Sequence, residues 1–359
     1  MRGKAVSPDV RRDCGAEPWP PDGLERVPMC PVCGCSERTT IHRNLTDAIF
    51  RCAPGLWEMH RCDRCGTCYL DARPNAQKIH LAYGKYFTHA DPRARQVGSL
   101  TGLRRLRRSF ANGYRNWRYG TQEEPATALG IWAVSAFPRA RRLVDAGMRF
   151  IPRGSSDRRL LDVGAGNGEY LLSIQSAGWK TVGVEPDAAA AAVAVRAGLD
   201  VRQGNIHSLE SEPASFDVIT MSHVIEHVHE PRAVLSEAFQ LLRPGGILYL
   251  ETPNIESYGH RRFGCHWRGL EPPRHLVLFN WSSLEEILRV IGFDVIKRRP
   301  RYGVYATQAA KSRAIARGED PEKLRRTEAL SWLADSFREV CMSVNHRRSE
   351  FITLVAQKR

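Results

Sequence analysis

The amino-acid sequence predicts an α/β domain built on a doubly wound parallel sheet, with a smaller cysteine-rich module ahead of it. From Arg158 onward, short apolar runs alternate regularly with helical patterns. The first run ends in a glycine-rich turn, Gly164–Gly168, just before a helical pattern. Two Cys-x-x-Cys pairs stand upstream, between residues 30 and 65. A chain of 359 residues has room for both units.

The strands and helices of the large domain follow from this alternation. The expected strands are residues 159–163, 181–185, 201–203, 216–221, 246–252, 293–297 and 351–357. The expected helices are residues 168–177, 187–197, 231–242 and 282–291. We divide the chain into a disordered, proline-rich N-terminus (1–28), a zinc ribbon (29–75), a helical connector or lid (76–152) and the α/β domain (153–359), which carries a helical insertion at about 303–345.

Composition limits the partners and the compartment. The formal net charge is +14, and four arginines cluster within residues 104–108. Such a balance is typical of proteins that bind nucleic acid, anionic lipid surfaces or phosphorylated substrates, and equally of proteins from arginine-rich, high-GC genomes. Residues 1–28 lack the apolar core of a signal peptide, and the longest weakly polar run, 126–137, is too short to span a bilayer. We therefore expect a cytoplasmic protein.

The two cysteine pairs predict a structural zinc site. Cys30 and Cys33, and then Cys62 and Cys65, are each followed by a glycine that lets the backbone turn back toward the sulfurs. Four thiolates complete a tetrahedral Zn²⁺ site and leave no open position for catalysis. A redox pair would need a thioredoxin-like βαβ context, which is missing here. Three further cysteines are alternative ligands or spare thiols: Cys35, Cys52 and Cys68.

The connector carries an aromatic stripe. Large apolar residues recur at helical spacing between Leu103 and Trp117, with arginines on the opposite face. A stripe of this kind usually belongs to a core, whereas alternating Trp and Arg also suit an RNA or membrane surface. We expect a lid or a bridge between the ribbon and the α/β domain.

The glycine-rich turn predicts a nucleoside-like ligand. Glycines permit positive φ and let a ligand lie against backbone N–H groups at the helix N-terminus. Glu185 ends the second strand, where its carboxylate can accept both ribose hydroxyls. Asp162 lies below the turn, able to order it or to meet an ammonium group. Asn205 offers an amide to an adenine edge and Ile206 an apolar face.

The residues of these motifs resemble a known family. LLDVGAGNGEYL, GVEPD, FDVITMSHVIEHV and LLRPGGILYLETPN, in this order, resemble the motifs of class I S-adenosylmethionine-dependent methyltransferases. The resemblance implies a Rossmann-like seven-stranded sheet of order 3-2-1-4-5-7-6, its last strand antiparallel, and S-adenosyl-L-methionine as cofactor. The cofactor-binding residues that it implies are Asp162, Gly164, Ala165, Gly166, Gly168, Glu185, Pro186, Asn205, Ile206 and Ser222. Asn205 departs from the Asp that the family often has there.

The acceptor side is expected after the fifth strand, over the carboxyl ends of the sheet. We expect His275 to be the general base; the alternative is a hydrogen-bonded residue that orients this loop. Trp267 and Arg274 contact the acceptor or pack under the loop. Residues 223–227 match the inverted zinc-protease string H-x-x-E-H, but they follow a strand and precede a proline-initiated helix, so a structural or pocket-lining role is expected.

The order ribbon, connector and catalytic domain is similar to bacterial methyltransferases of sugar and cell-surface polysaccharide pathways. This similarity implies methyl transfer to a small-molecule acceptor, sugar- or nucleotide-linked. Two alternatives stay open: an RNA methyltransferase, with the ribbon and the arginines of residues 104–108 as its footprint, and an inactive cofactor-binding scaffold. Peripheral membrane contact is compatible with the sequence.

Overall fold

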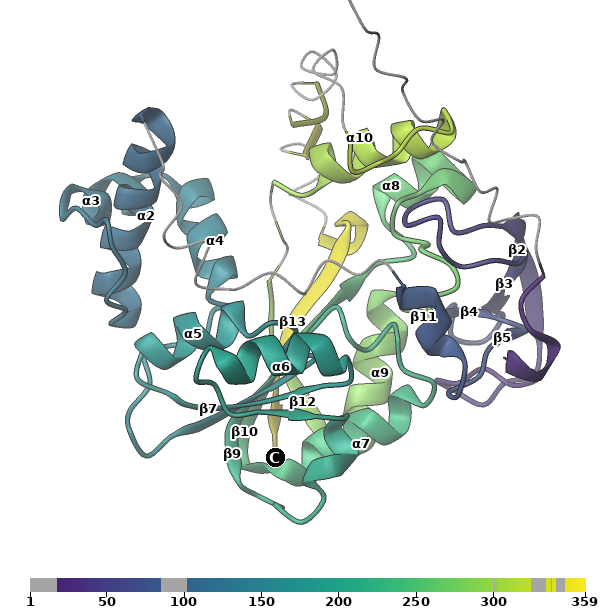
Figure 1. Cartoon of the computed structure of the whole chain (residues 1–359), viewed down its shortest axis with the longest axis horizontal. Helices are drawn as coiled ribbons and strands as arrows, with labels where there is room; N and C mark the ends of the chain where they lie inside the picture. The colour runs from purple at the N-terminus through teal and green to yellow at the C-terminus, as the bar shows by residue number, and fades with distance from the viewer. Residues whose placement is uncertain are drawn as a thin grey trace, which may run out of the picture.

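The computed structural model describes residues 18–84, 102–299, 301, 303–323, 334–336, 338, 339 and 346–359. Figure 1 shows an α/β domain between two outlying parts, a cysteine-rich module and a group of three helices. No helix among the described residues is both long and apolar enough to cross a membrane. Parts of three expected regions lie outside the described residues: residues 1–17 of the N-terminus, residues 85–101 of the connector and most of residues 324–345 of the helical insertion.

The α/β domain contains a seven-stranded sheet. Its strands are β6 (Arg159–Val163), β7 (Lys180–Glu185), β8 (Val201–Gln203), β9 (Phe216–Ser222), β10 (Leu242–Pro253), β12 (Phe293–Arg298) and β13 (Phe351–Lys358). They lie in the order β12-β13-β10-β9-β6-β7-β8. The strands from β8 to β10 are parallel, and β13 is antiparallel to both of its neighbours. This is the 3-2-1-4-5-7-6 arrangement, so the predicted fold class is confirmed.

Four helices cover this sheet. They are α5 (Glu169–Ser176), α6 (Ala188–Arg196), α7 (Pro231–Leu241) and α9 (Trp281–Ile291). α5 and α6 pack on β7, and α7 packs against α9 (Figure 1). Gly168 stands at the N-terminus of α5 with φ of +84°, a left-handed conformation that glycine adopts without strain. A Cβ there would lie 2.3 Å from Leu199 Cδ1, so helix packing requires glycine as well.

The cysteine-rich module, residues 18–84, shares a sheet with the α/β domain. Its strands are β1 (Leu24–Glu25), β2 (Arg38–Leu45), β3 (Trp57–Cys62), β4 (Cys68–Leu70) and β5 (Arg73–Pro74), and η2 (Ile79–Tyr83) follows. The fourth strand of the β2-β3-β4 sheet is β11 (Val277–Leu278), which comes from the segment after β10. The ribbon is therefore continued by the α/β domain rather than being a self-contained unit.

Residues 18–28 correct the expectation of a disordered stretch over 1–28. Trp19 is buried, meets Trp57 edge to face and donates from Nε1 to the Gly23 carbonyl. β1 pairs with β5. The prolines and charges of this stretch suggested too little apolar surface to bury, but Trp19 and Val27 together anchor it to the module.

Three helices form the helical arm, residues 102–147: α2 (Gly102–Tyr119), α3 (Leu129–Ala136) and α4 (Pro138–Gly147). α2 and α3 approach closely, because a Cβ on Gly130 would lie 2.2 Å from the Phe110 carbonyl oxygen. The aromatic stripe is divided, since Tyr114 is buried and Trp117 is exposed. Figure 1 places the arm and the cysteine-rich module on opposite sides of the α/β domain.

Four further helical elements lie after β10: α8 (Tyr258–Phe263), η4 (Gly264–His266), α10 (Tyr305–Ala316) and η6 (His346–Arg348). Two short 3-10 helices lie before it: η1 (Pro21–Gly23) and η3 (Ile206–Leu209). α10 packs against α8 and η4. α10 and the described helical residues 334–336, 338 and 339 lie between the last two strands, where the sequence predicts a helical insertion.

Candidate functional site: a cavity beside the glycine turn

A cavity of about 1250 Å³ lies between the glycine turn and the helical arm. The cavity is lined by the turn and by segments from several elements: Ala165, Gly166 and Asn167 of the turn, Ser222 and His223 at the end of β9, Glu251 of β10, Arg301, Arg108 and Arg115 of α2, and residues 146–149 at the end of α4. Ligands of open α/β sheets bind at the carboxyl ends of the strands, where this cavity is found. Residues of the helical arm thus form one side of this cavity.

Glu185 holds the glycine turn in place. Its Oε2 accepts from the Gly166 amide at 2.8 Å, and its Oε1 accepts from the Asp187 amide at 2.9 Å. Burial raises the pKa of Glu185, and the two backbone hydrogen bonds oppose that rise. Both carboxylate oxygens thus face backbone donors at the edge of the turn, one strand from β8.

Asp162 and Arg149 form a buried pair below the turn. Arg149 donates from Nη1 to Asp162 Oδ1, which also accepts from Thr220 Oγ1 at 2.7 Å. Burial raises the pKa of Asp162, and Arg149 and Thr220 oppose this. Asp162 Oδ2 is buried with no hydrogen-bond partner among the described residues. An acceptor left in this state fits a ligand ammonium group.

Arg149 is a site residue that the sequence analysis missed. It lines the cavity, and its guanidinium lies 3.6 Å from the centre of the Tyr170 ring. It precedes β6 in a segment without a recognisable motif, and its φ of +49° turns the chain at this point. A cation beside the turn fits the carboxylate of a ligand whose ammonium group meets Asp162.

The expected adenine-side residues lie outside the lining of this cavity. Pro186 and Asn205 are exposed, and Ile206 is buried. The Asn205 side chain accepts from the His207 amide at 3.1 Å and so caps η3. Glu185 and Gln203 are paired in the sheet, so Asn205 follows the end of the strand next to the one that ends in Glu185.

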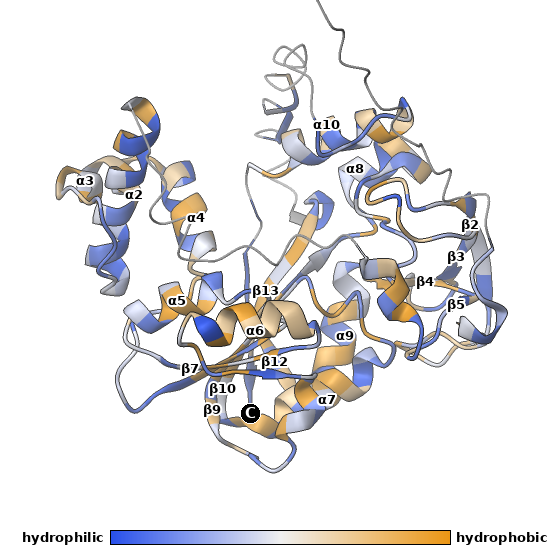
Figure 2. Ribbon diagram, viewed as in Figure 1, coloured by the Kyte–Doolittle hydropathy of each residue, from blue (hydrophilic) through white to orange (hydrophobic). Residues whose placement is uncertain are grey.

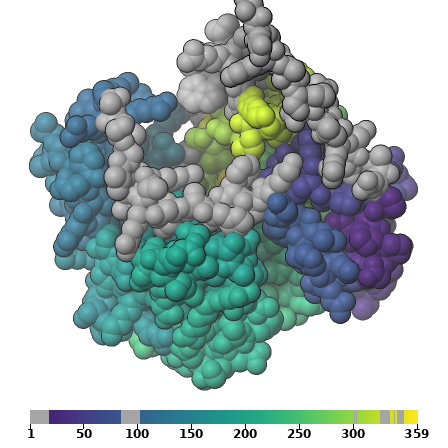
Figure 3. Space-filling model, in the orientation of Figure 1, coloured from purple at the N-terminus to yellow at the C-terminus, as the bar shows by residue number. Residues whose placement is uncertain are grey.

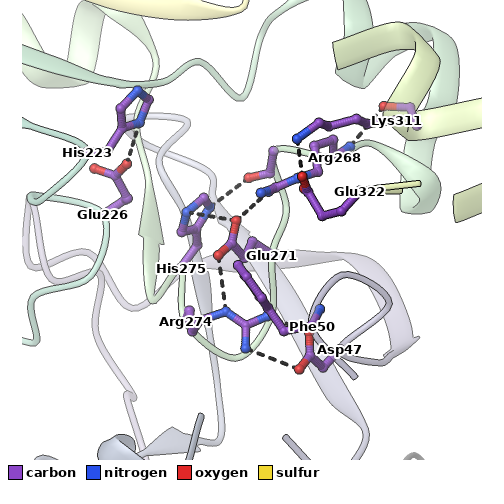
Figure 4. A network of polar contacts seen from close by, with 12 residues as sticks. Asp47, Phe50, His223, Glu226, Arg268, Glu271, Arg274, His275, Lys311 and Glu322 are labelled. Carbon is purple, nitrogen blue, oxygen red and sulfur yellow. Dashed lines mark hydrogen bonds and ion pairs between the residues drawn. The ribbon is translucent and has the colours of Figure 1, made fainter. Parts of the chain in front are cut away.

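His223 stands on the cavity wall between two carboxylates. Nδ1 lies 3.1 Å from Glu226 Oε1, and Nε2 lies 3.4 Å from Glu251 Oε1. Burial lowers the pKa of His223, but these two partners outweigh it and raise the value to about 10. The imidazole is therefore protonated at neutral pH, although 39% of the side chain is exposed. Figure 4 shows the ring directed toward Glu226.

Glu251 is the buried counterpart of His223. Tyr249 and Thr353 donate their hydroxyls to Oε2, at 3.1 and 2.9 Å, and Arg301 Nε lies 3.5 Å away. Burial raises the pKa of Glu251, but the opposing effects of His223 and Arg301 are larger and lower it to about 2. The wall of the cavity thus carries a fixed imidazolium–carboxylate pair.

Comparison with known proteins identifies the domain. Residues 137–298 match the family model described as a methyltransferase domain. The sheet order, the glycine turn and this match agree. The α/β domain has the class I methyltransferase fold.

Similar proteins carry related names. A protein named "Probable S-adenosylmethionine-dependent methyltransferase/" from Mycolicibacterium smegmatis is 34% identical over 143 residues, which are 38% of this chain and 52% of that protein. A ubiquinone biosynthesis O-methyltransferase from Colwellia psychrerythraea is 32% identical over 114 residues, 29% of this chain and 46% of that protein. A solved SAM-dependent methyltransferase from Archaeoglobus fulgidus is 21% identical, with a TM-score of 0.42, over 64% of this chain and 99% of that one. The chain spans about half the length of the curated relatives it matches.

His275, the expected base of the methyltransferase domain, is not in the lining of this cavity. Nδ1 donates to the Gly269 carbonyl at 2.8 Å, and the ring packs edge-on against His227. Burial lowers the pKa of His275 to about 4, against the charge of Glu271. The geometry matches the alternative expectation, a histidine that orients the loop after β10. Residues 223–227 adopt turns rather than a helix, so they lack the helix that an inverted zinc-protease site requires.

Arg274 and Trp267 pack beneath the same loop. Arg274 is fully buried and pairs with Asp47 of the cysteine-rich module, while its Nε donates to Glu271 Oε1 at 3.1 Å (Figure 4). Its guanidinium lies 4.2 Å from the centre of the Phe50 ring. Trp267 donates from Nε1 to Glu350 Oε2 at 2.9 Å. Both side chains therefore hold the loop instead of facing the cavity.

The four predicted zinc ligands come together. The sulfurs of Cys30, Cys33, Cys62 and Cys65 lie within 4.8 Å of one another. Gly34 and Gly66 adopt positive φ and donate their amides to the carbonyls of Cys30 and Cys62. This donor set and its closure fit a tetrahedral Zn²⁺ site. The other expected cysteines stand apart from the cluster: Cys35, Cys52 and Cys68.

Proposed function

We propose that this chain transfers a methyl group from S-adenosyl-L-methionine to a small, polar acceptor bound in the cavity. The observation that carries the proposal is the buried oxygen Asp162 Oδ2, which has no hydrogen-bond partner among the described residues and lies next to Arg149 and the glycine turn. The donor's ammonium group would meet Asp162 and its carboxylate Arg149. Glu185 would take the ribose hydroxyls, and Asn205 and Ile206 the adenine.

The remaining proposed donor contacts are backbone and small-residue contacts. Gly164, Ala165, Gly166 and Gly168 would let the donor approach the turn, Pro186 would flank its adenosine, and Ser222 would border the reacting atoms. S-adenosylmethionine supplies an activated methyl group on a sulfonium. The protein then contributes mainly orientation of the acceptor and exclusion of water, which the arm assists by closing the cavity.

His223 would orient the acceptor in the reaction. Because both ring nitrogens face carboxylates, the ring contributes a fixed positive charge and is already protonated at neutral pH. It adjoins Ser222 in the lining of the cavity. We therefore assign it acceptor positioning, in place of the role that the sequence analysis gave to His275.

A sugar- or nucleotide-linked acceptor suits the lining best. Half of the residues around the cavity carry charged or amide side chains: Arg108, Arg115, Gln122, Glu123, Glu124, Arg149, Asn167, Glu169, His223, Glu251 and Arg301. Polyhydroxylated acceptors need such hydrogen-bonding partners, whereas a planar apolar ring is better served by apolar walls. The domain order ribbon, arm and methyltransferase domain supports the same acceptor class.

The cysteine cluster is proposed to hold one structural Zn²⁺. Four thiolates close the coordination shell, so the ion would stabilise the ribbon and take no part in methyl transfer. Through β11, that stabilisation extends to the segment after β10.

The test is product formation with defined acceptors. The full chain is incubated with S-adenosylmethionine and, separately, nucleotide sugars, a catechol and total RNA, and S-adenosylhomocysteine is quantified. Turnover with a nucleotide sugar is the expected result. Salt-sensitive binding and turnover with RNA alone would favour the RNA methyltransferase alternative. Donor binding without turnover on any sugar, catechol or RNA would favour the inactive scaffold.

A further inference from the structure

Many large apolar side chains of the helical arm are exposed instead of being packed within the protein. Seven large apolar residues of the arm are exposed: Leu103, Leu106, Trp117, Leu129, Trp132, Phe137 and Leu143. Trp132 keeps 78% of its surface accessible, Leu129 67% and Phe137 66%. Single exposed apolar residues are ordinary, but a group of this size on one projecting unit marks an interaction surface.

The exposed group has a charge-free centre. α3 contains no charged residue, and its outward residues Leu129 and Trp132 are three positions apart, on one side of the helix. Phe137 follows directly and Leu143 continues the apolar surface on α4. The inner side of α3 is used for packing, since Gly130 and Val134 are buried.

Arginines dominate the charge of the helices on either side of α3 in the sequence. Residues 102–147 contain nine arginines and three acidic residues, and the exposed arginines lie on α2 and α4: Arg104, Arg105, Arg107, Arg118, Arg139, Arg141 and Arg142. Figure 2 shows hydrophobic and strongly hydrophilic stretches alternating along the arm, and Figure 3 shows the arm projecting at one side of the molecule. Apolar residues ringed by arginine are typical of helices that lie in a membrane interface.

We propose that the helical arm docks on the surface of an anionic phospholipid bilayer, with α3 inserted among the headgroups. The arginines of α2 and α4 meet lipid phosphates, and Leu129, Trp132 and Phe137 enter the boundary with the acyl chains. Trp is the side chain that suits such an interface best, having an apolar body and one N–H donor.

The charge and the side-chain chemistry favour a bilayer over two other occupants. A second copy of the chain would bring two arginine-rich surfaces together, which like-charge repulsion opposes. An RNA partner would use the arginines and stack on Trp132, but exposed aliphatic residues such as Leu129 and Leu143 contribute nothing to phosphate or base recognition. Of these three occupants, the lipid surface is the one that uses both kinds of residue.

Docking would also place the active-site cavity at the membrane. The arm itself lines that cavity, through Arg108 and Arg115 of α2 and through Ala146 and Gly147 of α4. Leu129 and Trp132 are on α3, which packs on α2. A bilayer bound to α3 would therefore lie next to the helix that lines the cavity, a position suited to acceptors carried on lipid.

The experiment measures flotation of the full chain with vesicles. Vesicles of phosphatidylcholine with about one-third phosphatidylglycerol are compared with vesicles of phosphatidylcholine alone. Two arm variants are tested: Leu129→Ser with Trp132→Ser, and Arg104→Gln with Arg105→Gln. A matched control on α6 combines Val195→Ser with Arg196→Gln, since both of these residues are exposed and lie outside the cavity.

The wild type should bind the anionic vesicles and not the neutral ones. The arginine variant should bind about 30-fold more weakly, the apolar variant should lose binding, and the α6 control should match the wild type. Brominated lipid should quench the wild-type fluorescence more than that of Trp132→Phe, which keeps the fold.

Three outcomes would overturn the proposal. The first is wild-type protein that floats with neither kind of vesicle, and the second is an apolar variant that binds as well as the wild type. The third is binding of another partner in the absence of vesicle binding. A dimer that dissociates in the apolar variant would assign the surface to a second copy of the chain. An RNA complex that is lost in the arginine variant would assign it to RNA.

Discussion

Arg274 and Asp47, 227 positions apart in the sequence, form an ion pair with no solvent access to the guanidinium (Figure 4). The pair joins the cysteine-rich module to the loop after β10. Arg274 Nη1 donates also to the Ala82 carbonyl at 2.7 Å, and the Asp47 carboxylate accepts from the Cys52 and Ala53 amides. Loop and module are thereby locked together around one guanidinium.

Breaking this pair should destabilise the protein. Arg274→Ala leaves the Asp47 carboxylate buried without its main partner, which costs about 3–5 kcal/mol of unfolding free energy. Urea unfolding followed by circular dichroism measures the loss. Arg289→Ala, which breaks an exposed pair with Glu286, is the control and should change stability by less than about 1 kcal/mol. Equal effects of the two substitutions would contradict the importance of the buried pair.

Donor binding should depend on the pair below the glycine turn. Asp162→Asn and Arg149→Met should each weaken S-adenosylmethionine binding, by about 10- to 100-fold, because each removes a charge-assisted hydrogen bond. Calorimetric titration gives the affinity. Asp200→Asn, at an exposed carboxylate outside the cavity, serves as the control. Wild-type affinity in both site variants would refute the proposed orientation of the donor.

Substitutions of His223 and His275 should have different effects, the first on turnover and the second on stability. His223→Asn should reduce turnover by about 100-fold with little change in donor affinity, because the acceptor loses its orientation. His275→Asn should lower the unfolding temperature while turnover per folded molecule stays near the wild type. The reverse pattern would return the catalytic role to His275.

Stability should depend on pH through His223. Its pKa is about 10 in the folded chain, against the ordinary histidine value of 6.5, so protonation stabilises the fold. The stabilisation is fully present when the pH is below the pKa of His223 in the unfolded chain, and it is lost as the pH rises through the pKa in the folded chain. Urea unfolding of the wild type should therefore show stability falling progressively from about pH 6.5 to about pH 10. His223→Asn should flatten this decline; an unchanged slope would exclude His223 as its source.

Metal content should follow the cysteine cluster. The purified chain is expected to hold about one zinc ion, and Cys62→Ser should lose it. Elemental analysis measures the ion, and thermal unfolding should show the ribbon destabilised. Cys265→Ser, at an exposed cysteine outside the cluster, should keep the metal. Zinc-free wild-type protein that folds normally would argue for a thiol cluster without metal.

The sheet was predictable because its signals are local. Strand, turn and helix alternate with short periods, and Gly168 at the start of α5 needs positive φ in any fold of this kind. The order of strands came from the family resemblance, and the structure confirms it. The cysteine pairs were equally visible, since two knuckles at this spacing have few other uses.

The acceptor side was harder to predict because its contacts are distant in sequence. His275 stands in a loop suited to a base, but only the fold shows that Gly269 and His227 occupy its surroundings. Arg149 lies in a segment without a motif and becomes a site residue through its pairing with Asp162. Trp19 was misjudged because its partner Trp57 lies in another segment of the module.

The strand β11 makes the cysteine-rich module and the α/β domain structurally dependent on each other. Because β11 supplies the fourth strand of the ribbon sheet, an exchange of ribbons between related proteins must carry the segment 268–278 with it. A methyltransferase domain expressed from residue 153 alone would present β11 as an unpaired edge and Arg274 without Asp47. Such a fragment should aggregate, so any functional dissection of this protein by truncation has to keep the ribbon.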